Sequence, residues 1–172
     1  NMASHSYLYA GPDGVGKKLM ALGFAKLLNC PGSADSPDKG CECPSCRKID
    51  RGIHPDVVLI EFTGVKNIKV DQVREEIEEK LYLRPFEGRY KIVIVDEAER
   101  MNHSAQNAFL KTLEEPPPHV KFIFATTEIR KVPVTVLSRC QRFDLRRIDE
   151  PALSSHLANI TAKEEAKADP AA

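Results

Sequence analysis

The chain has 172 residues, which is enough for one domain with a substantial core and a small appendage. A formal net charge of zero favours no nucleic-acid partner and excludes none, and 42% apolar with 29% charged residues is ordinary for a globular protein. No apolar run reaches the length of a membrane span, so we expect a cytoplasmic protein without membrane contact. Four of the five cysteines lie in one short stretch, which argues against a secreted disulfide framework.

A glycine-rich loop follows the first expected strand, residues 7–10, and precedes an expected helix over residues 17–29. The loop, residues 11–18, reads Gly-Pro-Asp-Gly-Val-Gly-Lys-Lys and matches the phosphate-binding pattern G-x-x-x-x-G-K at every position. Its glycines allow consecutive N–H groups to face one concavity, and Lys17 would contact the β- and γ-phosphates of a nucleotide. The Ser or Thr that ligates Mg²⁺ is replaced by Lys18, and an ammonium group cannot coordinate a cation.

The cysteines of residues 30–46 form a C-x10-C-x-C-x2-C series within a segment rich in Gly, Pro, Ser and Asp. This composition predicts an inserted loop, and the C-x-x-C spacing is typical of a tetrahedral zinc site. We expect a closed structural zinc site formed by Cys30, Cys41, Cys43 and Cys46; free thiols or a redox pair are the alternative. Cys140 stands apart and is expected to be a buried apolar residue, whereas His54, His103 and His119 are expected on the surface or in turns.

Further strands are expected at residues 57–61, 91–96, 121–126 and 142–145, with helices over 70–81, 104–115 and 134–137 between them. The alternation of strands and helices, with apolar runs that suit strands covered on both faces, predicts an α/β fold with a parallel sheet. Another helix is expected after residue 149. We therefore predict a P-loop domain over residues 1–148, and the start of a truncated lid domain, or a tail, over residues 149–172.

Polar residues follow two of the apolar strands. In nucleotide hydrolases of this architecture, an Asp at the end of a strand holds the Mg²⁺ water shell and the next Glu polarises the attacking water, which are the roles open to Asp96 and Glu97. Thr126 and Thr127 could hydrogen-bond a phosphate or cap a turn. Arg139 could reach the γ-phosphate of a neighbouring subunit or form an ordinary surface ion pair, and its chemistry alone does not decide between them.

Together these segments resemble the AAA+ ATPase domain of bacterial clamp-loader subunits, the gamma/tau and delta-prime subunits of DNA polymerase III. The resemblance extends over nearly the whole chain and is carried by the four-cysteine insertion and by residues 9–17, 94–101, 107–117, 122–127 and 137–143. Leu-Lys-Thr-Leu-Glu-Glu-Pro-Pro (110–117) followed by Ser-Arg-Cys (138–140) is highly specific to that group. The altered residue 18 and the segments 54–56 and 98–102 resemble delta-prime, whereas 119–122 and 125–131 are closer to gamma/tau.

The resemblance implies an AAA+ RecA-like domain in a hetero-pentameric ring with gamma/tau and delta subunits, which loads the sliding clamp onto primed DNA. It implies nucleotide-binding positions at Gly11, Gly14, Val15, Gly16, Lys17, Lys18, Asp96, Thr126 and Thr127, an ancestral catalytic Glu97, and Arg139 as an arginine finger donated in trans. We favour a delta-prime-like subunit with weak or absent hydrolysis, which leaves binding of ATP and Mg²⁺ open. The alternatives are a gamma/tau-like ATPase motor and a zinc-containing DNA-binding module, and this chain on its own is expected to be monomeric.

Overall fold

The computed structural model describes residues 4–32, 41–61, 81–101, 109–110 and 112–164. In these residues five parallel strands form one sheet in the order β2-β3-β4-β1-β5. The strands are β1 (Ser6–Ala10), β2 (Val57–Glu61), β3 (Lys91–Asp96), β4 (Val120–Thr126) and β5 (Gln141–Asp144). All five expected strands are therefore present, and the predicted parallel α/β sheet flanked by helices is confirmed.

The three central strands are apolar on both faces because helices cover both sides of the sheet. Every residue of β1 and β4 is buried, as are the four consecutive apolar residues 92–95 of β3. The outer strands differ, since all of β5 is exposed and β2 is only partly buried. Continuous apolar runs thus mark the interior of the sheet, as parallel sheets require.

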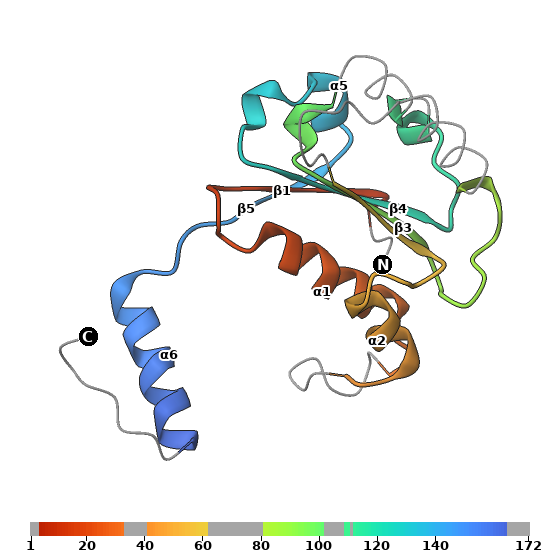
Figure 1. The fold of residues 1–172 in the computed structure, drawn as a ribbon. Coiled ribbons are helices and arrows are strands. Elements are labelled where there is room, and N and C mark those ends of the chain that lie inside the picture. The colour runs from red at the N-terminus through yellow and green to blue at the C-terminus, as the bar shows by residue number, and fades with distance from the viewer. Residues whose placement is uncertain (1–3, 33–40, 62–80, 102–108, 111, 165–172) are drawn as a thin grey trace.

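Two helices lie on one side of the sheet, and α5 lies on the other (Figure 1). The first pair is α1 (Lys17–Asn29) and α2 (Pro44–Asp50), and they pack through Ala21, Ala25 and Ile49 against outward side chains such as Ile94. The opposite face packs against α5 (Val134–Leu137) and the helical residues 109–110 and 112–114. There Phe109 meets the rings of Phe122 and Phe124 edge-on at 6.0 Å, which locks the second layer onto the sheet.

Several local expectations need correction or extension. Residues 30–46 are not a loop throughout, because α2 begins at Pro44, a residue well suited to the first turn of a helix. Two 3₁₀ helices, η1 (Ala98–Arg100) and η2 (Ile129–Lys131), were not expected. The helix expected over 134–137 is present, and the described residues 109–110 and 112–114 of the one expected over 104–115 are helical. Residues 70–80 of the helix expected over 70–81 lie outside the described residues.

The helix expected after residue 149 is α6 (Glu150–Lys163), which begins at the capping residue Asp149. None of its residues is buried, and it projects away from the sheet (Figure 1). Among the described residues, none of the helices combines the length and the apolar character needed to cross a membrane.

Candidate functional site

The glycine loop between β1 and α1 adopts a conformation that only its glycines allow without strain. Gly14 and Gly16 have φ values of +74° and +89°, in the left-handed region, and Gly16 caps α1. Gly11 is required for a different reason, since a Cβ there would lie 2.5 Å from the carbonyl oxygen of Leu145. The loop also joins β4, because the Gly11 N–H donates to the carbonyl of Thr126 at 3.2 Å. The turn is thus fixed by its neighbours before any ligand is considered.

Lys17 is buried at the start of α1, and its ammonium group folds back onto the loop. Nζ donates to the carbonyl oxygens of Gly11 at 3.0 Å and Pro12 at 2.9 Å. These two bonds use two of the three ammonium hydrogens and hold the positive charge inside the concavity of the loop.

Lys18, one residue further along α1, forms an ion pair with Glu61. Glu61 ends β2 and is the register partner of Asp96 in β3, so the pair stands beside the aspartate that would hold a metal's water shell. This arrangement does not fit a hydroxyl-ligated Mg²⁺ site, because a fixed cation occupies the position of the missing ligand. Sequence reasoning missed Glu61, since it becomes a neighbour of Lys18 only through the order of the strands.

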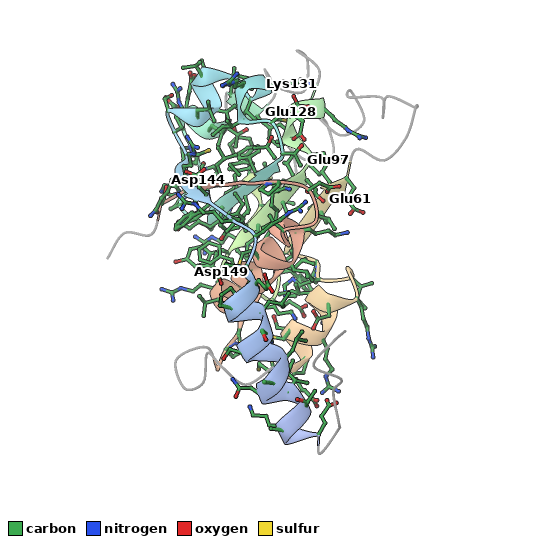
Figure 2. All side chains as sticks on the ribbon, turned by 90° about the vertical axis from the view of Figure 1, so that its left-hand side faces the viewer. Glu61, Glu97, Glu128, Lys131, Asp144 and Asp149 are labelled. Atoms are coloured by element: carbon green, nitrogen blue, oxygen red, sulfur yellow. The ribbon has the colours of Figure 1, made fainter. Side chains whose placement is uncertain are left out.

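Polar residues from the ends of several strands converge on one edge of the sheet, where Figure 2 shows Glu61 and Glu97 on the same side of the molecule. A cavity of about 260 Å³ lies at this edge. Its lining includes seven of the residues implied by the resemblance, Gly14, Gly16, Lys17, Lys18, Asp96, Glu97 and Thr127, together with Asp13 and Leu19, which were not expected. Gly11, Val15 and Thr126 are not part of this lining. The structure thus brings together the two lysines and the two strand-end carboxylates predicted from the sequence.

Glu97 occupies the left-handed region, with φ 53° and ψ 48°, and is the one described non-glycine residue with a positive φ. A side chain is disfavoured there by roughly 1 kcal/mol, and such strain is found preferentially at functional sites. Its carboxylate pairs with Arg100 at 3.1 Å, while its N–H donates to the carboxylate of Asp96, also at 3.1 Å. The carboxylate of Glu97 is therefore held at the cavity by its own turn.

Thr126, the last residue of β4, and Thr127, which follows it, differ in burial and in their other contacts. Thr126 is fully buried, and its hydroxyl accepts the N–H of Glu128 at 3.1 Å, which is a turn cap. Thr127 lines the cavity and donates from both its hydroxyl (2.5 Å) and its N–H (3.2 Å) to the carboxylate of Glu99. Burial acts to raise the pKa of Glu99, but the hydrogen bonds from Thr127 and Thr126 outweigh it and hold that pKa below its ordinary value. Thr127 therefore faces a carboxylate that is ionised at neutral pH.

Arg139 follows α5 and is not part of the cavity lining. Its guanidinium donates to the carbonyl of Thr135 at 2.9 Å and to the carboxylate of Glu114 at 3.1 Å. The side chain retains 35% of its accessible surface, so the partners it has within the chain leave it open to solvent. An exposed pair of this kind contributes little to stability, about 0–1 kcal/mol.

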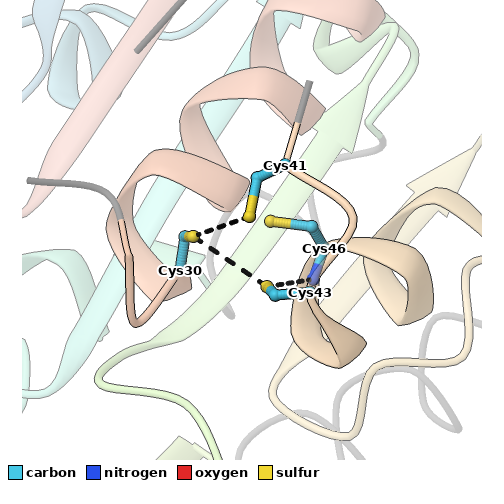
Figure 3. A group of neighbouring side chains, drawn as sticks. All are labelled: Cys30, Cys41, Cys43 and Cys46. Atoms are coloured by element: carbon cyan, nitrogen blue, oxygen red, sulfur yellow. Dashed lines mark hydrogen bonds between the residues drawn. The ribbon is translucent and has the colours of Figure 1, made fainter. Parts of the chain in front are cut away.

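The four cysteines expected to bind metal come together beyond the C-terminal end of α1 (Figure 3). All four sulfur atoms lie within 4.8 Å of one another, with Cys30 3.5 Å from Cys41 and 3.9 Å from Cys43. A tetrahedral Zn²⁺ with Zn–S bonds of about 2.3 Å requires sulfurs about 3.8 Å apart, so the donor set and its spacing fit this ion. The cluster lies about 20 Å from the glycine loop, the length of the 13-residue α1, and so cannot take part in chemistry there.

Thiol acidity in this cluster is uneven. The backbone N–H of Cys46 donates to Cys43 Sγ at 3.4 Å and lowers the pKa of Cys43 to about 7. Burial raises the pKa of Cys46, so this thiol needs a metal to become a thiolate at neutral pH. Cys140 was expected to be buried; it is partly buried against the core, away from the cluster, and burial raises its pKa to about 12.

His54 was expected on the surface or in a turn; it lies between the turns that precede β2, but it is buried, with 4% of its surface exposed. Nδ1 of His54 accepts the N–H of Asp56 at 3.1 Å, so the ring proton is on Nε2. Nε2 donates to the hydroxyl of Ser45 at 3.1 Å, and this hydroxyl donates to the carbonyl of Asn29. Burial lowers the pKa of His54, in agreement with a neutral ring. This chain of bonds links the region between Cys30 and Cys46 to the start of β2. His119 is half-buried, and its Nε2 contacts the carbonyl of Leu81 at 3.0 Å; His103 lies outside the described residues.

Comparison with known proteins gives concordant matches. A family model described as "DNA polymerase III, delta subunit" matches residues 1–149. The chain is 43% identical over 164 residues to the DNA polymerase III subunit tau/gamma of Haemophilus influenzae, covering 95% of this chain and 23% of that protein. It is 44% identical over 163 residues to subunit tau of Bacillus subtilis, covering 94% of this chain and 28% of that protein. The chain thus spans about a quarter of the length of these curated relatives.

A solved structure is similar as well. The crystal structure of a DNA polymerase III gamma subunit-related protein of Thermotoga maritima superposes with a TM-score of 0.64 at 26% identity, covering 88% of this chain and 44% of that one. These three relatives carry the names tau or gamma rather than delta-prime. The comparisons therefore leave the two kinds of subunit undistinguished, with the names on the side of tau/gamma.

Proposed function

The chain belongs to the DNA polymerase III delta subunit family, and on this premise we propose that it is a clamp-loader subunit acting in DNA replication. Its partners would be other clamp-loader subunits, gamma/tau and delta, in a hetero-pentamer, and through them the sliding clamp and primed DNA. Within that assembly we propose a delta-prime-like role, in which the chain completes a neighbour's ATP site while its own site does not hydrolyse ATP. The observation that carries this role is the ion pair between Lys18 and Glu61, which stands where the metal-ligating hydroxyl belongs.

The geometry of Arg139 supports the proposal that the chain completes the ATP site of a neighbouring subunit. The guanidinium is not at the chain's own cavity, it is partly exposed, and it is held by a surface carboxylate that a stronger anion would displace. A guanidinium offers a planar set of donors suited to the charge that develops on a phosphoryl group. We propose that Arg139 leaves Glu114 and contacts the γ-phosphate bound to the adjacent subunit.

We propose a structural role for the cysteine cluster, with Zn²⁺ held by Cys30, Cys41, Cys43 and Cys46. The ion would join the end of α1 to the beginning of α2, because Cys30 follows α1 and Cys43 caps α2. Four thiolates leave no open position for water, so the site would stabilise the fold and would not act as a Lewis acid.

ATP turnover in the reconstituted complex tests the proposed role. The full-length protein alone should show no turnover above background, and Arg139→Ala should lower turnover at the neighbouring site at least tenfold, since arginine fingers contribute 10³–10⁵ in kcat. Arg142→Ala is the matched control, because Arg142 is an exposed arginine that pairs with Asp144. Robust turnover by the unmutated protein alone, or equal activity of the two variants, would contradict the proposal.

A gamma/tau-like ATPase motor is the second candidate, and the names of the curated relatives favour it. In that case Lys18 would be compatible with hydrolysis, and Lys18→Thr would leave turnover by the isolated protein unchanged or moderately higher. Under the delta-prime-like proposal, the unmutated protein does not hydrolyse ATP when it is alone. The same assay therefore separates the two candidates.

A further inference from the structure

We propose that Lys18 acts as the built-in cation of the cavity, so that this site binds the diphosphate group of a nucleotide without a divalent metal. The inference deepens the proposed function, on which it rests, by naming what a silent site would still bind. It follows from the disagreement between the residues present and a Mg²⁺ site.

The position of Lys18 is fixed by two features. It lies in the first turn of α1, directly after Lys17, so its backbone belongs to the loop that would surround the phosphates. Its ammonium group is held by the carboxylate of Glu61, and its side chain retains 43% of its accessible surface while lining the cavity. The positive charge is thus anchored on one side and remains open to the cavity on the other.

A divalent ion would be repelled from this position. Asp96 is the register partner of Glu61, so a metal held through Asp96 would lie next to the ammonium of Lys18. Glu61 is already neutralised by Lys18 and Glu97 by Arg100, so Asp96 and Asp13 are the carboxylates of the lining that remain to offset the charge of the ion. A nucleotide arriving with its own Mg²⁺ brings this repulsion with it, whereas the metal-free nucleotide does not.

The cavity nevertheless offers what a diphosphate needs. Lys17 and Lys18 provide two ammonium groups, and the left-handed Gly14 and Gly16 turn the loop so that its N–H groups can face inward. Asp13 accepts the N–H of Gly14 at 2.9 Å through its own exposed side chain, a local bond that a phosphate oxygen would replace. Lys17, and Lys18 on the side that faces away from Glu61, therefore offer a diphosphate two cationic contacts that need no metal.

Isothermal titration of the protein with ADP tests the proposal, once in EDTA and once in excess MgCl₂. We expect binding in EDTA that becomes at least fivefold weaker in MgCl₂. Lys18→Thr should reverse this order, weakening binding in EDTA at least tenfold and making it stronger with MgCl₂. Lys26→Thr is the matched control on the same helix, because Lys26 pairs with Asp50 away from the cavity, and it should behave as the unmutated protein.

Three results would overturn the proposal: no ADP binding in EDTA, binding that requires MgCl₂, or a Lys18→Thr variant that retains the preference of the unmutated protein. Circular dichroism of each variant verifies that the fold is retained. These titrations need no partner subunit, so they can fail while Arg139 still stimulates a neighbour, and the reverse also holds. The failure of this inference is therefore distinguishable from failure of the proposed function.

Discussion

Asp56 provides a sharp test of how the fold holds the start of β2. The carboxylate is 2% exposed and accepts three backbone N–H groups, from Phe86 at 2.7 Å and from Glu87 and Gly88 at 2.8 Å each. Burial acts to raise the pKa of Asp56, but these three bonds prevail and hold it below its ordinary value. The ionised carboxylate, just before β2, thus holds residues 86–88, just before β3, against the start of β2.

The variant Asp56→Asn removes one acceptor and turns an amide N–H toward a backbone N–H. A hydrogen bond to a charged group contributes about 1.5–3 kcal/mol, and the two remaining bonds lose their charge assistance, so we expect a loss of about 3 kcal/mol in the free energy of unfolding. For a chain of this size that is a fall of about 6–12 °C in Tm. Urea denaturation at pH 7 measures the effect, with Asp50→Asn as control, because the exposed pair of Asp50 with Lys26 should contribute about 0–1 kcal/mol.

The pH dependence gives a second measurement on the same pair of proteins. Because the folded pKa of Asp56 is lowered, its contribution is fully present above the unfolded value of about 3.9 and is lost as pH falls through the folded pKa. The stability difference between the unmutated protein and Asp56→Asn should therefore be constant from pH 7 to about pH 5 and shrink below about pH 4. A loss under about 1 kcal/mol at pH 7, or a loss equal to that of Asp50→Asn, would refute the reasoning.

Three further outcomes are expected. Gly11→Ala should destabilise the fold by at least about 2 kcal/mol in urea denaturation, because its Cβ would lie 2.5 Å from the carbonyl oxygen of Leu145. Gly23→Ala within α1 has open space around the new Cβ and should stabilise the fold by about 0.5–1 kcal/mol. Equal effects of the two variants would contradict this reasoning. Because burial lowers the pKa of His54, the contribution of its neutral ring to stability is present above about pH 6.5 and is lost at lower pH. The urea concentration at the unfolding midpoint should therefore decrease as the pH is lowered from about 6.5 to about 5, and it should decrease less in His54→Gln. Metal analysis should find one zinc ion per chain. A chelator should lower the Tm of the unmutated protein but not that of Cys46→Ser. Retention of zinc by Cys46→Ser would count against the four-sulfur site.

Much of the fold was accessible from the sequence because its signals are local. The apolar run of residues 92–95 needs cover on both faces wherever it occurs, and the glycine pattern before Lys17 requires a turn that few other residues allow. Other features depend on which elements become neighbours. The burial of His54 and the pairing of Lys18 with Glu61 arise only after β2 joins the edge of the sheet, so neither could be read from spacing along the chain.

The missed helix α2 is a different case, because part of its signal was present. Pro44 suits the first turn of a helix, and Cys43 caps that turn by accepting the N–H of Cys46. The glycine- and proline-rich composition of the surrounding segment outweighed this signal. Cys43 was expected only as a metal ligand or as a free or redox-active thiol, although its sulfur also caps α2.

The two ends of α1 are attached to the neighbouring strands β2 and β3, at opposite ends of these strands. At its start Lys18 pairs with Glu61 at the end of β2, and at its last residue Asn29 exchanges two hydrogen bonds of 2.8 and 2.9 Å with the backbone of Tyr90, just before β3. A Cβ at Gly88 would lie 2.7 Å from the Asn29 side chain, so this second attachment is tightly packed. Because α1 is fixed at both ends, loss of metal from the cysteines beyond Asn29 should loosen that end while the cavity at Lys18 keeps its shape. We therefore expect the cysteine cluster and the glycine loop, which lie at the two ends of one helix, to bind their proposed ligands independently.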